Sequence, residues 1–140
     1  MILSAPATLL TAVVTLLAVL VTLGIAMMVS RVRTRVNIKP PAMSGSPDLE
    51  VALRIHGNTV EQFILFLPSL WLAALYFQGW IPGILGLAWC VGRVLYALGY
   101  RADRPGGRAP GFFISMLSTL ALIVLAAIGI AKAWMVASAS

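Results

Sequence analysis

Residues 5–29 read APATLLTAVVTLLAVLVTLGIAMMV, an apolar run of 25 residues without a charge. A helix of about 20 apolar residues is long enough to cross the hydrocarbon core of a bilayer. The apolar segment of a cleaved signal peptide is shorter, about 7–15 residues, and follows a basic segment. Residues 1–4 contain no Lys or Arg. The run therefore predicts a permanent membrane span.

Three more apolar stretches pass the same length test, at about 55–77, 80–100 and 111–131. The chain of 140 residues is 61% hydrophobic and 10% charged, whereas soluble domains carry about 25% charged residues. These features predict an all-α integral membrane protein. Its expected architecture is one domain, residues 1–140, folded as a four-transmembrane-helix bundle.

Residues 30–53 form the longest connection between these spans and contain Pro40, Pro41 and Gly45, which do not continue a helix. The segment 46–50, SPDLE, then places a proline and two acidic residues where a helix would begin. Proline is favoured in a first helical turn, and acidic side chains are favoured near a helix N-terminus. We expect the second helix to start there.

Basic residues predict the orientation in the membrane. Eight of the ten lie in or beside the first and third connections: Arg31, Arg33, Arg35, Lys39, Arg54, Arg101, Arg104 and Arg108. Only Lys132 lies near the other side. Because loops rich in Lys and Arg stay cytoplasmic, we expect residues 30–53 and 101–110 in the cytoplasm and both termini in the periplasm of a bacterial inner membrane.

The net charge of +6 is explained by these topology clusters, so no nucleic-acid partner is expected. Cys90, the sole cysteine, lies inside an apolar run and is read as a small buried residue. One cysteine does not make a metal site, and none is predicted.

Polar residues interrupt two spans at a similar depth. Arg54, Asn58 and Glu61 are spaced i, i+4, i+7, which places them on one face of the second helix. His56 lies on the opposite face of that helix. Three further residues, Arg93, Tyr96 and Tyr100, form an i, i+3, i+7 stripe on the third helix.

Charges inside a membrane span are costly and need partners or water. One possibility is that Glu61 and Arg93 neutralise each other and only hold helices together. Another is that Arg54 and Asn58 hold Glu61 on its own helix. The surplus of arginines favours a third, an anionic ligand, because guanidinium groups bind carboxylates in bidentate fashion.

The segment 54–61, RIHGNTVE, resembles the second-helix signature of the MAPEG family, the membrane-associated proteins in eicosanoid and glutathione metabolism. The segment 93–100, RVLYALGY, resembles its third-helix signature, and residues 108–110, RAP, resemble the start of its fourth helix. Residues 40–50 are similar to the family's first loop. Together these motifs cover most of the chain and resemble small bacterial members of the family.

The resemblance implies a homotrimer in a lipid bilayer that binds glutathione as co-substrate between protomers, near the cytoplasmic face. It implies conjugation of glutathione to a lipophilic small-molecule substrate, or reduction of lipid hydroperoxides. By motif position, Arg108 or, as second choice, Arg104 would stabilise the thiolate. The ligand-binding residues would be Arg54, Asn58, Glu61, Arg93, Tyr96 and Tyr100, with Arg31 and His56 contributed by the neighbouring protomer.

Two other functions remain open at this stage. One is a noncatalytic lipid-binding or scaffold protein of the same fold. The other is a small proton-coupled exporter, since four spans and one membrane glutamate suit that class. The arginines around Glu61 count against an exporter of cations.

Overall fold

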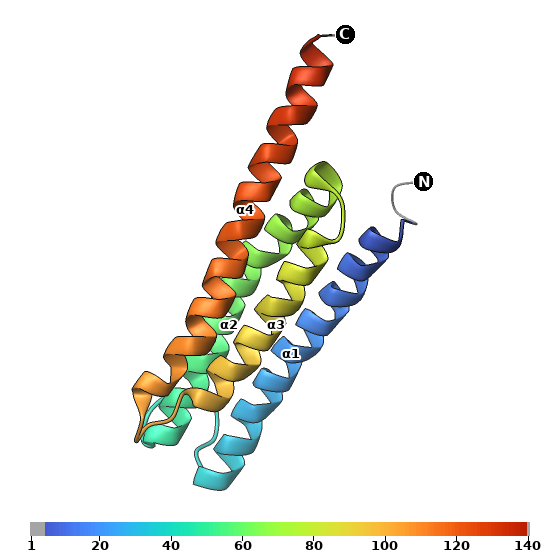
Figure 1. The fold of residues 1–140 in the computed structure, drawn as a ribbon. Coiled ribbons are helices and arrows are strands. Elements are labelled where there is room, and N and C mark those ends of the chain that lie inside the picture. The colour runs from blue at the N-terminus through green and yellow to red at the C-terminus, as the bar shows by residue number, and fades with distance from the viewer. Residues whose placement is uncertain (1–4, 140) are drawn as a thin grey trace.

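The computed structural model describes residues 5–139 as a bundle of four long helices (Figure 1). These are α1 (Pro6–Val36), α2 (Pro47–Leu72), α3 (Ile81–Gly99) and α4 (Ala109–Ser138). A π-helical turn, η2 (Ala73–Phe77), continues α2, and a 3-10 turn, η3 (Pro105–Arg108), precedes α4. Each of the four long helices is long and apolar enough to span a bilayer. The protein is therefore a multi-pass membrane protein, as predicted.

Three of the four helices extend beyond the predicted spans, whereas α3 (Ile81–Gly99) lies within the predicted span 80–100. α1 continues from residue 29 to Val36 and ends on Asn37 in the left-handed conformation, and α4 continues from residue 131 to Ser138. The second helix begins at Pro47, with Asp48 and Glu50 in its first turn, as the local sequence predicted. The span predictions measured apolar length, whereas a helix continues past the apolar region as long as its backbone hydrogen bonds are made.

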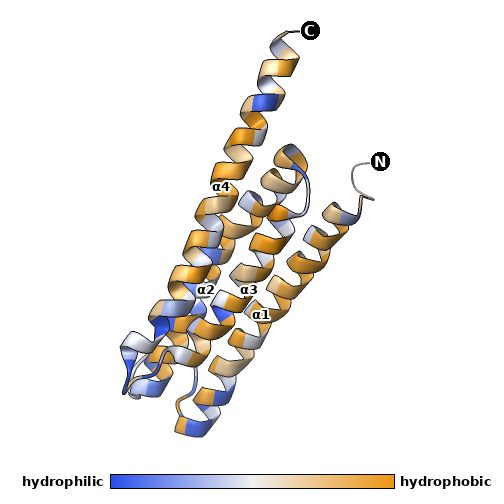
Figure 2. Ribbon diagram, in the orientation of Figure 1, coloured by the Kyte–Doolittle hydropathy of each residue, from blue (hydrophilic) through white to orange (hydrophobic). Residues whose placement is uncertain are grey.

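Hydrophilic residues gather at the end of the bundle that holds the α1–α2 and α3–α4 connections (Figure 2). The start of α1 and the end of α4 lie at the opposite end, where α4 projects past its neighbours (Figure 1). We call the end with the two connections the polar end. In the α1–α2 connection, Arg33 Nη1 donates a hydrogen bond to the carbonyl oxygen of Ala42 at 2.7 Å, which ties the connection to the end of α1.

Small residues allow the helices to approach closely. A Cβ added at Gly86 on α3 would come within 2.6 Å of Val14 on α1, and one at Gly92 would lie 2.8 Å from the backbone nitrogen of Ser115 on α4. A Cβ at Gly111 on α4 would collide with the backbone nitrogen of Tyr96. Close contact between backbones is typical of membrane helix packing. These glycines therefore set the spacing of α3 from α1 and α4.

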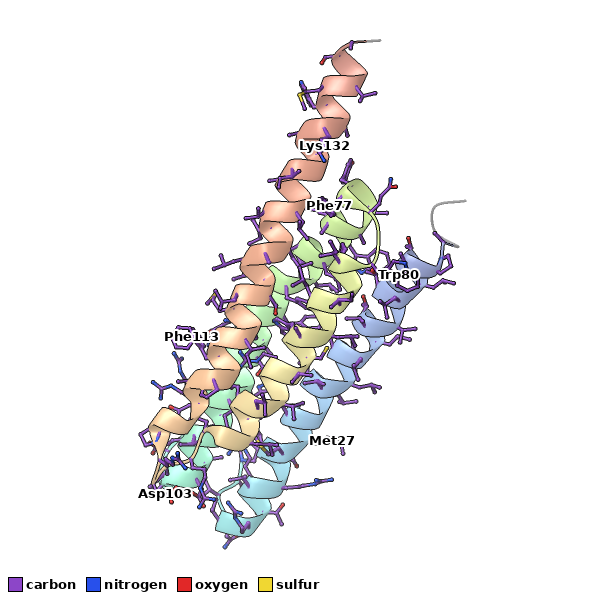
Figure 3. The ribbon with its side chains drawn as sticks, in the orientation of Figure 1. Met27, Phe77, Trp80, Asp103, Phe113 and Lys132 are labelled. Atoms are coloured by element: carbon purple, nitrogen blue, oxygen red, sulfur yellow. The ribbon has the colours of Figure 1, made fainter. Side chains whose placement is uncertain are left out.

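The interior of the bundle is apolar at mid-depth and becomes polar toward the polar end. Trp89 is fully buried and stacks on Phe66, with ring centroids 4.1 Å apart. Outside the bundle, the helices carry many exposed Leu, Ile and Val side chains, which the sticks of Figure 3 show pointing outward. An apolar outer surface is expected where the solvent is lipid.

Candidate functional site

The two polar stripes predicted on the second and third helices meet at one pocket near the polar end. Its volume is about 360 Å³. It is lined by residues of α2, α3 and the start of α4: Arg54, Asn58, Tyr96, Tyr100, Arg108, Ala109, Phe112 and Phe113. Five of these eight are residues that the sequence singled out. We call this hollow the arginine pocket.

Each wall of the arginine pocket follows from local sequence. Arg54 and Asn58 are one turn apart on α2, and Tyr96 lies in the last turn of α3, with Tyr100 directly after the end of that helix. The two tyrosine rings contact each other edge to face, with centroids 5.7 Å apart. Arg108 ends the 3-10 turn η3 and directly precedes α4.

Both guanidinium groups of the pocket are free of carboxylate partners. Among residues 5–139, neither Arg54 nor Arg108 forms an ion pair. The guanidinium carbon of Arg108 instead lies 4.8 Å from the ring centre of Tyr100, a cation–π contact that holds it against the pocket wall. Two unpaired cations beside an apolar bilayer are suited to an anionic ligand.

Arg93 lies directly behind this pocket and is fully buried. Its Nη2 donates to Asn58 Oδ1 at 3.0 Å and to Thr59 Oγ1 at 3.2 Å. Its Nη1 donates to Ser115 Oγ at 3.3 Å. The guanidinium carbon also stacks 4.1 Å from the ring centre of Tyr96. Arg93 therefore contacts two residues of the pocket wall while lying outside the pocket.

Glu61 is not the partner of Arg93. Its side chain is exposed, and it forms no ion pair with any residue in the described part of the chain. The suggested neutralisation of Arg93 by Glu61 is therefore wrong for this protomer, as is the suggestion that Arg54 pairs with Glu61. The reason is rotational, because Arg93 faces α4 and the interior side of α2, whereas Glu61 faces outward.

The remaining predicted residues lie outside the arginine pocket of the same protomer. Arg31 is exposed on α1, and His56 is half-buried on another face of α2. Arg104 is exposed in the α3–α4 connection. Of the two candidate thiolate arginines, the protomer thus places only Arg108 in the pocket.

The sequence reasoning missed the aromatic wall on α4 and the hydroxyl groups that hold Arg93. Phe112 and Phe113 line the pocket, and Thr59 and Ser115 accept hydrogen bonds from Arg93. Phe112 lies one helical turn after Arg108, so the i+4 spacing would have found it. No local signal identifies Ser115, because its role depends on how α4 packs against α3.

Comparison with known proteins decides the family. The profile of the MAPEG family matches residues 9–128. The chain belongs to the MAPEG family. An uncharacterised Synechocystis protein is 42% identical over 76% of this chain and 77% of its own length. Human microsomal glutathione S-transferase 2 is 36% identical over 79% of this chain and 74% of its length. Leukotriene C4 synthase of Cavia porcellus is 33% identical over 81% and 75%.

The family assignment agrees with the motifs that first indicated it. All four MAPEG-like segments fall inside the matched region, and the arginine pocket is built from three of them. The sequence-based recognition of the family and the four-helix membrane fold are therefore both confirmed.

Proposed function

We propose that this MAPEG protein is a membrane-bound glutathione-dependent transferase or peroxidase acting on lipophilic electrophiles or lipid hydroperoxides. The observation that carries the proposal is the arginine pocket, in which Arg54 and Arg108 offer two guanidinium groups that have no carboxylate partner within residues 5–139. Glutathione has two carboxylates, one ammonium group and one thiol. The microsomal glutathione S-transferase among the relatives supports the same ligand.

The ligand-binding roles follow from where each side chain lies. Arg54 would bind a glutathione carboxylate, and the amide of Asn58 would donate to the peptide backbone because its oxygen already accepts from Arg93. Glu61, exposed one turn further along α2, would accept from the ammonium group. Tyr96 and Tyr100 would form the wall beside the cysteine of the tripeptide.

Arg108 is proposed to stabilise the thiolate. A free thiol has a pKa of about 8.5, and a nearby cation such as the Arg108 guanidinium favours the ionised form. The thiolate sulfur would attack an electrophilic carbon, and the leaving group would depart with its electron pair. With a hydroperoxide, the sulfur would attack the terminal oxygen and break the O–O bond. This gives an alcohol and a sulfenic acid, which a second glutathione converts to the disulfide and water.

The lipophilic substrate would approach from the bilayer. Phe112 and Phe113 line the pocket on α4, and Phe113 lies on the outer side of that helix (Figure 3). An apolar substrate dissolved in lipid would thus meet the thiolate without entering water. This arrangement also disfavours an exporter of cations, since the polar groups of the pocket include two arginines.

A homotrimer in the bacterial inner membrane, with the polar end in the cytoplasm, is part of the proposal. Arg31 and His56 lie away from the arginine pocket of their own protomer, which leaves them available to a neighbour's pocket. Glutathione is a cytoplasmic thiol, so a cytoplasmic polar end matches the supply of co-substrate and the basic loops.

The test combines binding and turnover. We expect calorimetry of the purified protein to detect glutathione, and turnover to follow with chlorodinitrobenzene or a fatty-acid hydroperoxide. Arg54→Ala should lose affinity first, whereas Arg108→Ala should bind glutathione but show weak ultraviolet thiolate absorbance. Absence of glutathione binding would refute the proposal. Binding without turnover of any electrophile or hydroperoxide would favour a noncatalytic lipid-binding or scaffold protein.

A further inference from the structure

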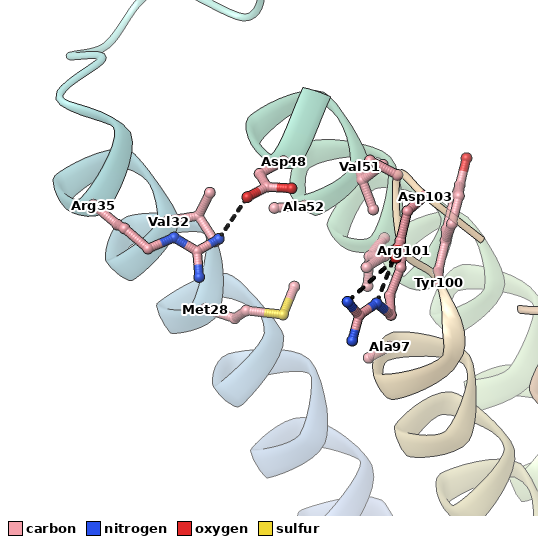
Figure 4. Close-up of a pocket in the computed structure, with 12 residues that line it drawn as sticks. Met28, Val32, Arg35, Asp48, Val51, Ala52, Ala97, Tyr100, Arg101 and Asp103 are labelled. Atoms are coloured by element: carbon pink, nitrogen blue, oxygen red, sulfur yellow. Dashed lines mark hydrogen bonds and ion pairs between the residues drawn. The ribbon is translucent and has the colours of Figure 1, made fainter. Parts of the chain in front are cut away.

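A second pocket at the polar end lies inside the protomer, between α1, the start of α2 and the end of α3 (Figure 4). Its volume is about 410 Å³, and Tyr100 is the only residue that it shares with the arginine pocket. Apart from Tyr100, the proposed glutathione chemistry uses no residue of this second pocket. Four charged side chains distinguish it: Arg35, Asp48, Arg101 and Asp103.

These four side chains form two ion pairs, and their net charge is zero. Arg35 Nη2 lies 3.0 Å from Asp48 Oδ2 and joins α1 to α2, and Arg101 Nε lies 3.0 Å from Asp103 Oδ1. Figure 4 shows the two pairs on different sides of the pocket. All four side chains are exposed, and exposed ion pairs contribute little free energy. Charged groups of a ligand can therefore join or replace them at small cost.

Asp103 stays ionised in this arrangement. The hydrogen bonds from Arg101 hold the pKa of the Asp103 carboxyl below its usual value and raise the pKa of Arg101. The pocket thus presents both signs of charge throughout the neutral pH range. Its inner surface is apolar, with Met28 and Val32 of α1 facing Ala97 of α3.

An apolar groove lies further along the same α1–α3 seam, toward the middle of the membrane. It has a volume of about 240 Å³ and is lined only by apolar or thiol side chains: Leu17, Val21, Cys90, Val91, Val94 and Leu95. On α1 the groove ends at Val21 and the charged pocket begins at Met28. These seven residues span roughly 10 Å at 1.5 Å per residue. One leaflet of the hydrocarbon core is about 15 Å deep.

We propose that the α1–α3 seam binds one phospholipid with an ethanolamine headgroup. The phosphate would contact Arg35 and Arg101, the primary ammonium would contact Asp48 and Asp103, and one acyl chain would lie in the groove. A carboxylate accepts hydrogen bonds from a primary ammonium, whereas the quaternary ammonium of choline has no N–H to donate. Choline is instead bound by several aromatic rings, and this pocket has only Tyr100.

Lipid retention tests this site directly. The full-length protein is reconstituted with equal amounts of phosphatidylethanolamine, phosphatidylcholine and phosphatidylglycerol and examined by native mass spectrometry. We expect retained phosphatidylethanolamine to exceed phosphatidylcholine by about fivefold, the ratio that one favourable interfacial charge contact provides. Equal retention, or a preference for phosphatidylglycerol, would overturn the proposal.

Variants separate the headgroup contacts from the fold. Asp48→Asn and Asp103→Asn should each reduce the preference, and Asp103 lies in a connection where the substitution does not interrupt a helix. Glu50→Gln is the matched control, because Glu50 lies on the same first turn as Asp48 but does not line the pocket. An unchanged preference in Asp103→Asn, or an equal loss in Glu50→Gln, would contradict the assignment.

The groove and the source of the headgroup have their own tests. Val94→Trp should fill the groove and lower retention of phosphatidylethanolamine while glutathione binding is kept. Soluble phosphoethanolamine at millimolar concentration should not displace the bound lipid, since it lacks the acyl chain. Displacement by phosphoethanolamine, or full retention in Val94→Trp, would show a site for a free headgroup and would overturn the phospholipid proposal.

Discussion

Replacing Arg93 by methionine tests whether Arg93 positions Asn58 for ligand binding or only stabilises the fold. Arg93→Met removes three hydrogen bonds and the stacking on Tyr96, each of the hydrogen bonds worth about 1.5–3 kcal/mol with a charged donor. It also removes a buried cation, whose desolvation costs several kcal/mol. Thr59 and Ser115 keep their own bonds to the carbonyl oxygens of Ile55 and Gly111. We therefore expect a stability change of about 2 kcal/mol or less.

The effect on glutathione binding should be similar in size to this change in stability. Without Arg93, the amide oxygen of Asn58 loses its donor at 3.0 Å, and the amide group is free to turn away from the arginine pocket. Losing one preorganised hydrogen bond costs about 0.5–1.5 kcal/mol. This corresponds to an affinity loss of about two- to twelvefold. Thermal unfolding in detergent and calorimetry with glutathione measure the two quantities on the same sample.

Glu61→Gln provides the contrast. Because Glu61 is exposed and forms no ion pair within residues 5–139, this change should leave the melting temperature unchanged and weaken only glutathione binding. Asp103→Asn, in the α3–α4 connection and outside the arginine pocket, should affect neither. If Arg93→Met unfolds the protein with unchanged affinity per folded molecule, the positioning role is wrong. If Glu61→Gln destabilises the protein by about 3–5 kcal/mol, Glu61 and Arg93 form a buried ion pair.

Four further outcomes are expected. Gly111→Ala should disrupt the α3–α4 contact and lower the melting temperature strongly, because an added Cβ collides with the backbone of Tyr96, whereas Gly106→Ala meets no atom within 4 Å and should be neutral; equal melting temperatures would contradict the packing. Arg108→Ala should lower the chemical step more than Arg104→Ala in single-turnover assays, and the reverse order would move the thiolate role to the other arginine. Reporter domains fused after Ser140 should be active in the periplasm and not in the cytoplasm, and native mass spectrometry in detergent should give a trimer rather than a monomer or dimer.

The sequence by itself determined the membrane architecture. The length of four apolar runs and the absence of charge in 5–29 predict the spans, and the clustering of basic residues predicts their orientation. The stripes on the second and third helices predicted four residues that line the arginine pocket, and the resemblance of residues 108–110 to the family's fourth-helix start predicted a fifth, Arg108. These features are local, since the membrane fixes where a helix lies in depth and the 3.6-residue period fixes which side chains share a face.

Only the tertiary structure decided which faces meet. Arg93 hydrogen-bonds to Asn58, Thr59 and Ser115 and not to Glu61, because α3 packs so closely on α4 that its arginine is enclosed there. The same packing brings Arg108 over Tyr100, and the spacing of α1 from α3 creates a charged pocket that no single segment indicates. The rotation of one helix against another depends on small residues from both. The pattern of apolar and polar residues along one helix therefore does not predict this rotation.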